Sequence, residues 1–362
     1  MPQTTARPLP RTIEEITPEW MTAALRIRAP EVIVRDVEVI DVQHGTCTKV
    51  RLGLDLDERG RLAGIPDQVM LKGGFEQHSD SMMHLHEVEA RAYRDLFPEV
   101  DFPTPSSYFA DYDEEANNGM VIMEDLALRG VSFNNALHPR SPDEVSQGVR
   151  ALARFHAATW NSSEFESGRW SWVQPGIPFM RDYLLERYLV PDVWKHYVEL
   201  PRGAATSSRF HDLEWAKDAM ARLARLSERR PHVVLHGDPH VGNTYVAADG
   251  SPEFLDPMTR RDSAMWDVSY YTTVALDTAD RRICDRDLLR EYLEELVRSG
   301  VDDAPSFDDA LPDYGAYLAY GYLVFLINST DFLPEAINTA CTARFSDAML
   351  DHDTAGRLLE ID

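Results

Sequence analysis

The stretch that decides the fold spans residues 233–244 and reads VVLHGDPHVGNT. Its first three residues are apolar and predict a short buried strand. Gly237 and Pro239 then end the strand and force a loop, because glycine and proline interrupt regular structure. The strand therefore delivers Asp238 and Asn243 at the tip of a rigid element, where catalytic groups often lie. At this spacing a loop can hold a carboxylate near a hydroxyl nucleophile and an amide oxygen near a metal ion.

The residues that follow predict a hairpin that returns to this loop. Residues 244–246 have strand character, Asp249-Gly250 is a hairpin turn signal, and residues 254–255 begin a return strand. Because a hairpin brings its far end back beside its beginning, we expect Asp256 to lie next to the loop. Two carboxylates and an amide at one place suit an oxygen-ligated Mg²⁺ and phosphoryl transfer.

A lysine and a glutamate upstream predict a buried ion pair. Residues 68–74 read QVMLKGG, a buried strand that ends near Lys72, and a lysine in such a place usually has a partner. In a helix predicted over residues 80–97, Glu89 lies on the apolar face, whereas Glu87 falls off it. We therefore predict that Lys72 pairs with Glu89. The alternative is a lysine whose charged end reaches solvent and a glutamate at the edge of the buried face. Only the candidate site residues farther along the chain decide against it.

The rest of the first third of the chain is expected to form a sheet. Strand character is present over residues 32–42, 50–54 and 120–123. The loop HGTCT, residues 44–48, contains small residues that let backbone amides approach phosphates, although a plain hairpin turn is the alternative. Residues 1–11 are predicted to be a loose arm, and residues 111–119 a polar turn.

The remainder of the chain is predicted to be mostly helical. The sequence SPDE, residues 141–144, is a capping box with proline in the first turn. Further helices are predicted over residues 210–229, 287–296 and 314–327, with another opened by Asp267. His156 on an apolar helix is interpreted as a core histidine rather than a catalyst. The aromatic residues between 161 and 208 either wall a substrate site or pack.

The composition excludes several classes of protein. The 362 residues include 61 acidic and 36 basic ones, which gives a formal net charge of −25. That charge argues against non-specific binding of nucleic acid and against docking on an anionic membrane. The cysteines at 47, 284 and 341 are too far apart for a zinc motif or a disulfide framework. With no signal pattern at the N-terminus and an apolar run too short for a bilayer, we expect a cytoplasmic protein.

These motifs resemble those of aminoglycoside-phosphotransferase-like small-molecule kinases. The shared features are the run HGD at 236–238, the asparagine five residues after the aspartate, and Asp256 after the hairpin. Together with LARFHA at 152–157 and WDVSY at 266–270, they are closest to the ecdysteroid-kinase-like and choline-kinase-like branch. The resemblance implies an α+β, two-lobed protein-kinase-like fold. The implied boundaries are a β-rich N-lobe over residues 1–123, a hinge over 124–128 and a helical C-lobe over 129–362.

The resemblance also implies site residues, with ATP and Mg²⁺ as cofactors. Asp238 would be the catalytic base, and Asn243 and Asp256 would be the Mg²⁺ ligands. Lys72 and Glu89 would form the strand–helix ion pair of kinases. Thr46 would belong to the nucleotide-covering loop, and the backbone of Glu124 and Leu126 would contact adenine. Asp267 would support the catalytic loop by accepting its amides. The chain departs from the family at Pro257, where an aromatic residue is usual, and this leaves the flexibility of the metal loop open.

Two other functions remain open. The run HGDPH resembles a metallophosphoesterase fragment, but Pro239 prevents the helix that would place His236 and His240 on one face. Such hydrolases also need an early Asp-x-His pair followed by further histidine clusters, and the order here differs. The other alternative is a kinase-like module that binds nucleotide without turnover, against which the full set of key residues argues. ATP turnover, nucleotide-independent phosphatase activity or binding alone would separate the three.

The predicted reaction is transfer of the γ-phosphoryl group of ATP to a hydroxyl of a small molecule. The expected partner is that small molecule, with no nucleic acid and no membrane, and a homodimer is left open. Relatives of this kind accept aminoglycosides, amino alcohols, sterols and sugars. Nothing in the sequence selects among these acceptors, or between ATP and GTP.

Overall fold

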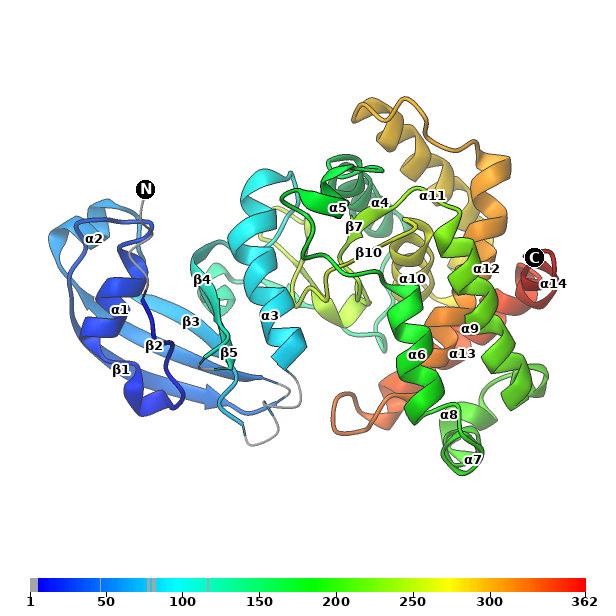
Figure 1. The fold of residues 1–362 in the computed structure, drawn as a ribbon, viewed down its shortest axis with the longest axis horizontal. Helices are drawn as coiled ribbons and strands as arrows, with labels where there is room; N and C mark the ends of the chain where they lie inside the picture. The colour runs from blue at the N-terminus through cyan, green and yellow to red at the C-terminus, as the bar shows by residue number, and fades with distance from the viewer. Residues whose placement is uncertain (1–5, 46, 77–78, 80–82, 116) are drawn as a thin grey trace. The chain divides into compact units, whose positions relative to one another are not determined.

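Two units make up the chain in a computed structural model, which describes residues 6–45, 47–76, 79, 83–115 and 117–362 (Figure 1). The first unit comprises residues 1–100 and 104–131, and the second comprises residues 101–103 and 132–362. Thr46, which we predict to cover the nucleotide phosphates, lies outside the described residues.

The first unit is built on a five-stranded antiparallel sheet in the order β1-β2-β3-β5-β4. Its strands are β1 (Val34–Gln43), β2 (Thr48–Leu56), β3 (Gln68–Gly73), β4 (Ser107–Asp113) and β5 (Asn118–Glu124). Its α-helices are α1 (Pro18–Leu25), α2 (Glu58–Leu62) and α3 (Met83–Arg91), and α3 continues into a π-helical turn, η3 (Ala92–Leu96). The 3₁₀ turns among the described residues of this unit are η1 (Ile13–Glu15), η4 (Phe97–Glu99) and η5 (Leu126–Arg129).

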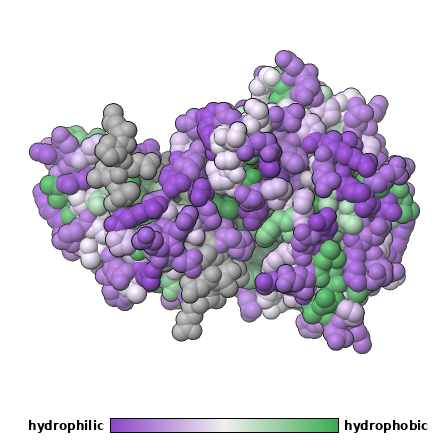
Figure 2. Space-filling view, in the orientation of Figure 1, coloured by the Kyte–Doolittle hydropathy of each residue, from purple (hydrophilic) through white to green (hydrophobic). Residues whose placement is uncertain are grey.

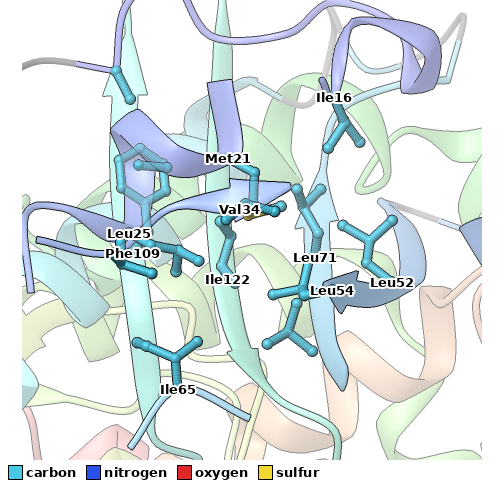
Figure 3. Close-up of a cluster of buried hydrophobic side chains, with 14 of the residues drawn as sticks. Ile16, Met21, Leu25, Val34, Leu52, Leu54, Ile65, Leu71, Phe109 and Ile122 are labelled. Carbon is cyan, nitrogen blue, oxygen red and sulfur yellow. The ribbon is translucent and has the colours of Figure 1, made fainter. Parts of the chain in front are cut away.

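Alternation along the strands gives this sheet two apolar faces. On one face, Leu52, Leu71 and Ile122 pack with residues of α1 into a buried core (Figure 3). On the other face, Met70 packs with Tyr93 of the turn that follows α3. Successive side chains of a strand point to opposite faces, so Lys72 shares a face with Met70. The helix α3 lies against β4 and β5, and the register of β3 therefore turns Lys72 toward it.

The loose arm predicted for residues 1–11 is wrong for the part that the structure describes. Ala6 and Leu9 are buried. The guanidinium of Arg7 donates to Asp111 Oδ2 at 3.1 Å, and the Leu9 N–H donates to Asp113 Oδ2 at 3.3 Å. A polar, proline-rich segment shows no periodicity, so its long-range partners are not visible in the sequence.

The polar turn predicted for residues 111–119 is also too long. Asp111 and Asp113 lie within β4, and Asn118 already begins β5. Acidic residues are uncommon in strands, but here Asp111 accepts from Arg94 at 2.5 Å as well as from Arg7. Pairing with arginines from other segments thus allows the strand to form.

The second unit has two small sheets and a majority of helices. The sheets pair β10 with β7, and β6 with β8 and β9. The strands are β6 (Ser132–Phe133), β7 (Val233–Leu235), β8 (Thr244–Val246), β9 (Pro252–Phe254) and β10 (Arg260–Asp262). The helices are α4 (Pro142–Ala157), α5 (Glu164–Ser167), α6 (Ile177–Arg187), α7 (Pro191–Glu199), α8 (Pro201–Ala204), α9 (Leu213–Glu228), α10 (Met265–Ala275), α11 (Thr278–Arg298), α12 (Phe307–Ile327), α13 (Glu335–Asp351) and α14 (Thr354–Leu359), with 3₁₀ turns η6 (Ser208–Phe210) and η7 (Val241–Asn243).

Helix boundaries in the second unit follow their caps. The capping box at the start of α4 is confirmed, with Ser141 and Glu144 each accepting the other's backbone N–H. Helix α12 begins at Phe307 rather than at the predicted residue 314, because Ser306 caps the N–H of Asp309 and Pro312 is accommodated inside the helix. Helix α11 is likewise longer at both ends than the predicted 287–296.

The surface agrees with the acidic composition. Much of the face seen in Figure 2 is hydrophilic. Among the described residues, no helix has both the length and the apolar character needed to cross a membrane.

Candidate active site

The predicted ion pair is present in the first unit. Lys72, near the end of β3, places its Nζ 2.6 Å from Oε1 of Glu89 on α3. The two side chains are only 7% and 10% exposed. A buried charge without a partner is strongly destabilising, so each residue is needed to accommodate the other. Helical spacing had identified the correct glutamate, since Glu87 instead pairs with Arg91.

The loop between β1 and β2 is fastened by a residue that the sequence did not single out. The Thr48 hydroxyl donates to Glu76 Oε1 at 2.6 Å, and His44 Nδ1 lies 2.7 Å from the same oxygen. Glu76 thus holds residues on both sides of position 46. No sequence signal marks Glu76, because it follows β3 in an irregular segment.

The segment predicted to contact adenine comprises the end of β5 and the turn η5. The Glu124 N–H donates to the Ser106 carbonyl at 2.9 Å. Leu126 is the first residue of η5, and the first N–H groups of a helix have no intrahelical acceptor. Asp125 accepts from the Ala127 N–H at 3.1 Å and from Arg51 Nε at 2.6 Å. The Leu126 N–H is therefore not the donor that Asp125 binds, and the roles of Glu124 and Leu126 stay a prediction.

In the second unit, α10 supports the backbone of the loop that follows β7. The N–H groups of His236 and Gly237 donate to the two oxygens of Asp267, at 2.7 and 3.1 Å. Gly237 has φ +84°, and a Cβ there would lie 2.1 Å from the Met258 carbonyl oxygen, so only glycine fits. The supporting role predicted for Asp267 is confirmed.

Two histidines complete this support from inside the unit. His236 is buried, its Nδ1 accepts from the Asp238 N–H at 3.4 Å, and its Nε2 donates to the Leu255 carbonyl at 3.1 Å. Burial lowers the pKa of His236, which keeps the ring neutral in this arrangement. His156 contacts the Tyr292 hydroxyl at 2.8 Å and Asp267 at 3.2 Å, which confirms it as a core histidine.

The Asp238 carboxylate is held by neutral donors. The Asn243 side-chain N–H₂ donates to Asp238 Oδ2 and to the Asp238 carbonyl, both at 3.0 Å. The Tyr270 hydroxyl donates to Oδ1 at 3.1 Å. His240 Nε2 lies farther away, 3.7 Å from Oδ2. No role was predicted for Tyr270. The only feature of the sequence that points to its contact with the loop is its position three residues after Asp267 on the same helix.

The predicted hairpin is confirmed by the pairing of β8 with β9. Beyond the paired residues, the Leu255 N–H donates to the Asn243 carbonyl at 2.9 Å, which places Asp256 one residue from this contact. Asp256 has φ +56°, in the left-handed region. A residue that precedes proline favours extended backbone, so this conformation ahead of Pro257 stores strain of about 1–3 kcal/mol.

The oxygen atoms at this place fit a hard cation. Because the Asn243 N–H₂ faces Asp238, the carbonyl oxygen of the same amide points the other way and is available as a ligand. Amide and carboxylate oxygens are ligands that Mg²⁺ takes in proteins, so Asn243 and the Asp256 carboxylate would suit this ion by their chemistry. Over the part of the chain that the structure describes, no group of three or more His, Cys, Asp or Glu residues could hold a metal.

The sequence-predicted site residues thus fall into two sets. Asp238, Asn243 and Asp256 come together in the second unit. Lys72, Glu89, Glu124 and Leu126 belong to the first unit.

The fold defined by these units is the protein-kinase-like fold of small-molecule kinases. An ethanolamine kinase of Plasmodium vivax matches with a TM-score of 0.51 and 12% identity, over 88% of this chain and 84% of that one. A choline/ethanolamine kinase family protein of Mesorhizobium loti matches with a TM-score of 0.46 and 13% identity, over 90% and 92%. A spectinomycin phosphotransferase, solved with ADP and spectinomycin, matches with a TM-score of 0.47 and 11% identity, over 93% and 98%. No curated protein matches the sequence.

The family follows from the sequence itself. The sequence model of the ecdysteroid kinase-like family matches residues 67–301, and the protein belongs to this family. The matched region runs from the start of β3 past the end of α11, and includes Lys72, Asp238 and Asp267. The resemblance inferred from the motifs is therefore confirmed.

Proposed function

We propose that the protein transfers the γ-phosphoryl group of ATP to a hydroxyl of a small molecule, with Asp238 as the base. In this reaction the acceptor oxygen bonds to the γ-phosphorus, the bond from that phosphorus to the β-phosphate oxygen breaks, and the hydroxyl proton passes to Asp238. The observation that supports the proposal most is the Asp238 carboxylate, which is held by the Asn243 amide and the Tyr270 hydroxyl and has His240 Nε2 at 3.7 Å.

The remaining residues bind and orient the nucleotide. Lys72, oriented by Glu89, would contact the α- and β-phosphates. Asn243 and Asp256 would hold Mg²⁺, which when bound neutralises charge on the β- and γ-phosphates. The loop at Thr46 would cover the phosphates, and the backbone of Glu124 and Leu126 would contact adenine. The Glu124 N–H already donates to the Ser106 carbonyl. The Glu124 carbonyl and the Leu126 N–H are therefore the backbone groups that suit contacts to adenine.

A phosphorylation screen tests this function. The protein is incubated with MgATP and a panel of amino alcohols, aminoglycosides, sterols and sugars, and mass spectrometry detects products that gain one phosphoryl group. The matched control is Asp238→Asn, which keeps the shape of the side chain and removes its basicity. A compound phosphorylated by the parent and not by the variant would support the proposal. Phosphatase activity without nucleotide would favour the hydrolase, and MgATP binding with no turnover on the whole panel would favour the binding module.

A further inference from the structure

The Asp238 carboxylate has a second support, the Tyr270 hydroxyl, to which the proposed function assigns no role of its own. Asn243 binds Oδ2 of Asp238, and the Tyr270 hydroxyl binds Oδ1. Each carboxylate oxygen therefore has one donor, which fixes the plane of the group. We infer that Tyr270 is a positioning residue, whose hydroxyl orients Asp238 toward the acceptor hydroxyl. This inference rests on the proposed function.

One helix holds both the backbone and the side chain of the loop. Asp267 and Tyr270 lie three residues apart on α10, and residues at this spacing share a helix face. Asp267 accepts the backbone N–H groups of His236 and Gly237, while Tyr270 reaches the carboxylate of the next residue, Asp238. Any tilt of the carboxylate would have to break a contact with this buried helix.

Tyr270 is itself held rigidly. Its side chain is buried, and its ring stacks on Phe325 with centroids 5.5 Å apart and an interplanar angle of 23°. Phe345 packs against the same ring, also at 5.5 Å. Burial raises the pKa of Tyr270 well above its usual value, so the hydroxyl stays a donor. Other ionisable groups that act on or lie near Asp238 are His236 and His240 on its own loop, Tyr320 on α12 and Cys341 on α13.

The position of a base strongly affects the reaction rate. A displacement of about 1 Å in a reacting group can cost about 100-fold in rate. If Tyr270 fixes Asp238, removing the hydroxyl should lower kcat and leave nucleotide binding unchanged. If the tyrosine only satisfies its own hydroxyl with the nearest acceptor, the same change should alter stability alone.

The test uses MgATP hydrolysis, with water in place of the acceptor alcohol, so that ADP and phosphate are the products. In Tyr270→Phe we expect kcat to fall by about 10- to 100-fold, with an unchanged Kd for MgATP. The matched control is Tyr271→Phe, because Tyr271 is the next residue on α10, is equally buried, and packs with its hydroxyl end against Gly148. The control should keep the parental kcat.

A further measurement separates positioning from packing. In the Asp238→Asn background, Tyr270→Phe should leave the residual rate unchanged, because no carboxylate remains to be oriented.

The outcomes are distinguishable. A parental kcat in Tyr270→Phe would overturn the inference while the proposed function stands. The inference would also be overturned if Tyr270→Phe lowered kcat by the same factor in the parent and in the Asp238→Asn background. A parental rate in Asp238→Asn alone would instead overturn the proposed function, and the inference with it.

Discussion

The two sets of predicted site residues, one in each unit, hold their charged groups in opposite ways. In the first unit, Lys72 and Glu89 neutralise each other at 2.6 Å, both almost fully buried. In the second unit, Asp238 is 23% exposed and receives hydrogen bonds from the neutral side chains of Asn243 and Tyr270. The first arrangement completes its charge balance within the protein. The second leaves a negative charge that a proton or a bound cation can still neutralise.

In the proposed function, this difference would separate binding from chemistry. A buried pair is stable only while both partners are present, which suits a lysine proposed to stay charged and oriented. A carboxylate held by neutral donors suits the group proposed to accept the hydroxyl proton. Five experiments test this comparison, from the largest expected effect to the smallest.

Asp238→Asn is expected to have the largest effect. Removing a general base typically lowers the rate by about 10²–10⁴-fold, and we expect this loss in kcat for the acceptor found in the screen. The amide keeps the size of the side chain, so thermal melting should stay near the parental value. A variant that keeps the parental kcat would show that Asp238 is not the base.

Lys72→Ala and Glu89→Ala should each destabilise the first unit. Removing one partner of a buried ion pair costs about 3–5 kcal/mol, measured here by urea unfolding. The double variant Lys72→Met/Glu89→Leu should recover much of the stability, because no uncompensated charge remains.

The same pair should be non-additive in catalysis. If Glu89 acts by orienting Lys72, losing either residue disables one unit, and contacting residues typically couple by about 0.5–3 kcal/mol. A double-mutant cycle on kcat/KM for ATP measures this coupling. Losses that simply add would remove the pair from the mechanism.

Asp256→Gly should change protein stability and MgATP binding in opposite directions. Glycine adopts the left-handed backbone of this position without the strain of about 1–3 kcal/mol that another residue stores there, so the melting temperature should rise. Loss of the carboxylate should weaken the binding of MgATP, which is measured by calorimetry. Asp256→Asn is the control, because asparagine tolerates this conformation but lacks the charge. Equal MgATP affinity in all three proteins would exclude Asp256 as a metal ligand.

The smallest effect is expected from the titration of His236. Burial lowers the pKa of His236 in the folded protein, so below about pH 6.5, the usual value for histidine, the unfolded chain binds more protons. Folding stability should then be complete above that pH and fall as the pH decreases. His236→Gln keeps a donor for the Leu255 carbonyl and does not titrate. Its stability should fall less between pH 7 and pH 5, as followed by urea unfolding at each pH, and an identical pH dependence would contradict this account.

Much of the candidate site could be predicted because its signals are local. The hairpin that returns Asp256 toward Asn243 is encoded within a few residues by strand character and the Asp249-Gly250 turn. The choice of Glu89 over Glu87 follows from helical spacing alone, since only one of them can face the sheet. Such patterns depend on backbone periodicity, which is a property of the segment itself.

The tertiary structure alone decided which distant polar groups meet. The hydroxyl of Tyr270 reaches Asp238 across 32 positions of the chain, and the Arg7 guanidinium reaches Asp111 across 104. Neither contact has a sequence pattern, because hydrogen bonds between segments depend on how the elements pack and not on the period within any one of them. The sequence by itself therefore determined the family, the elements and the candidate groups, while packing decided which neutral donors hold the Asp238 carboxylate.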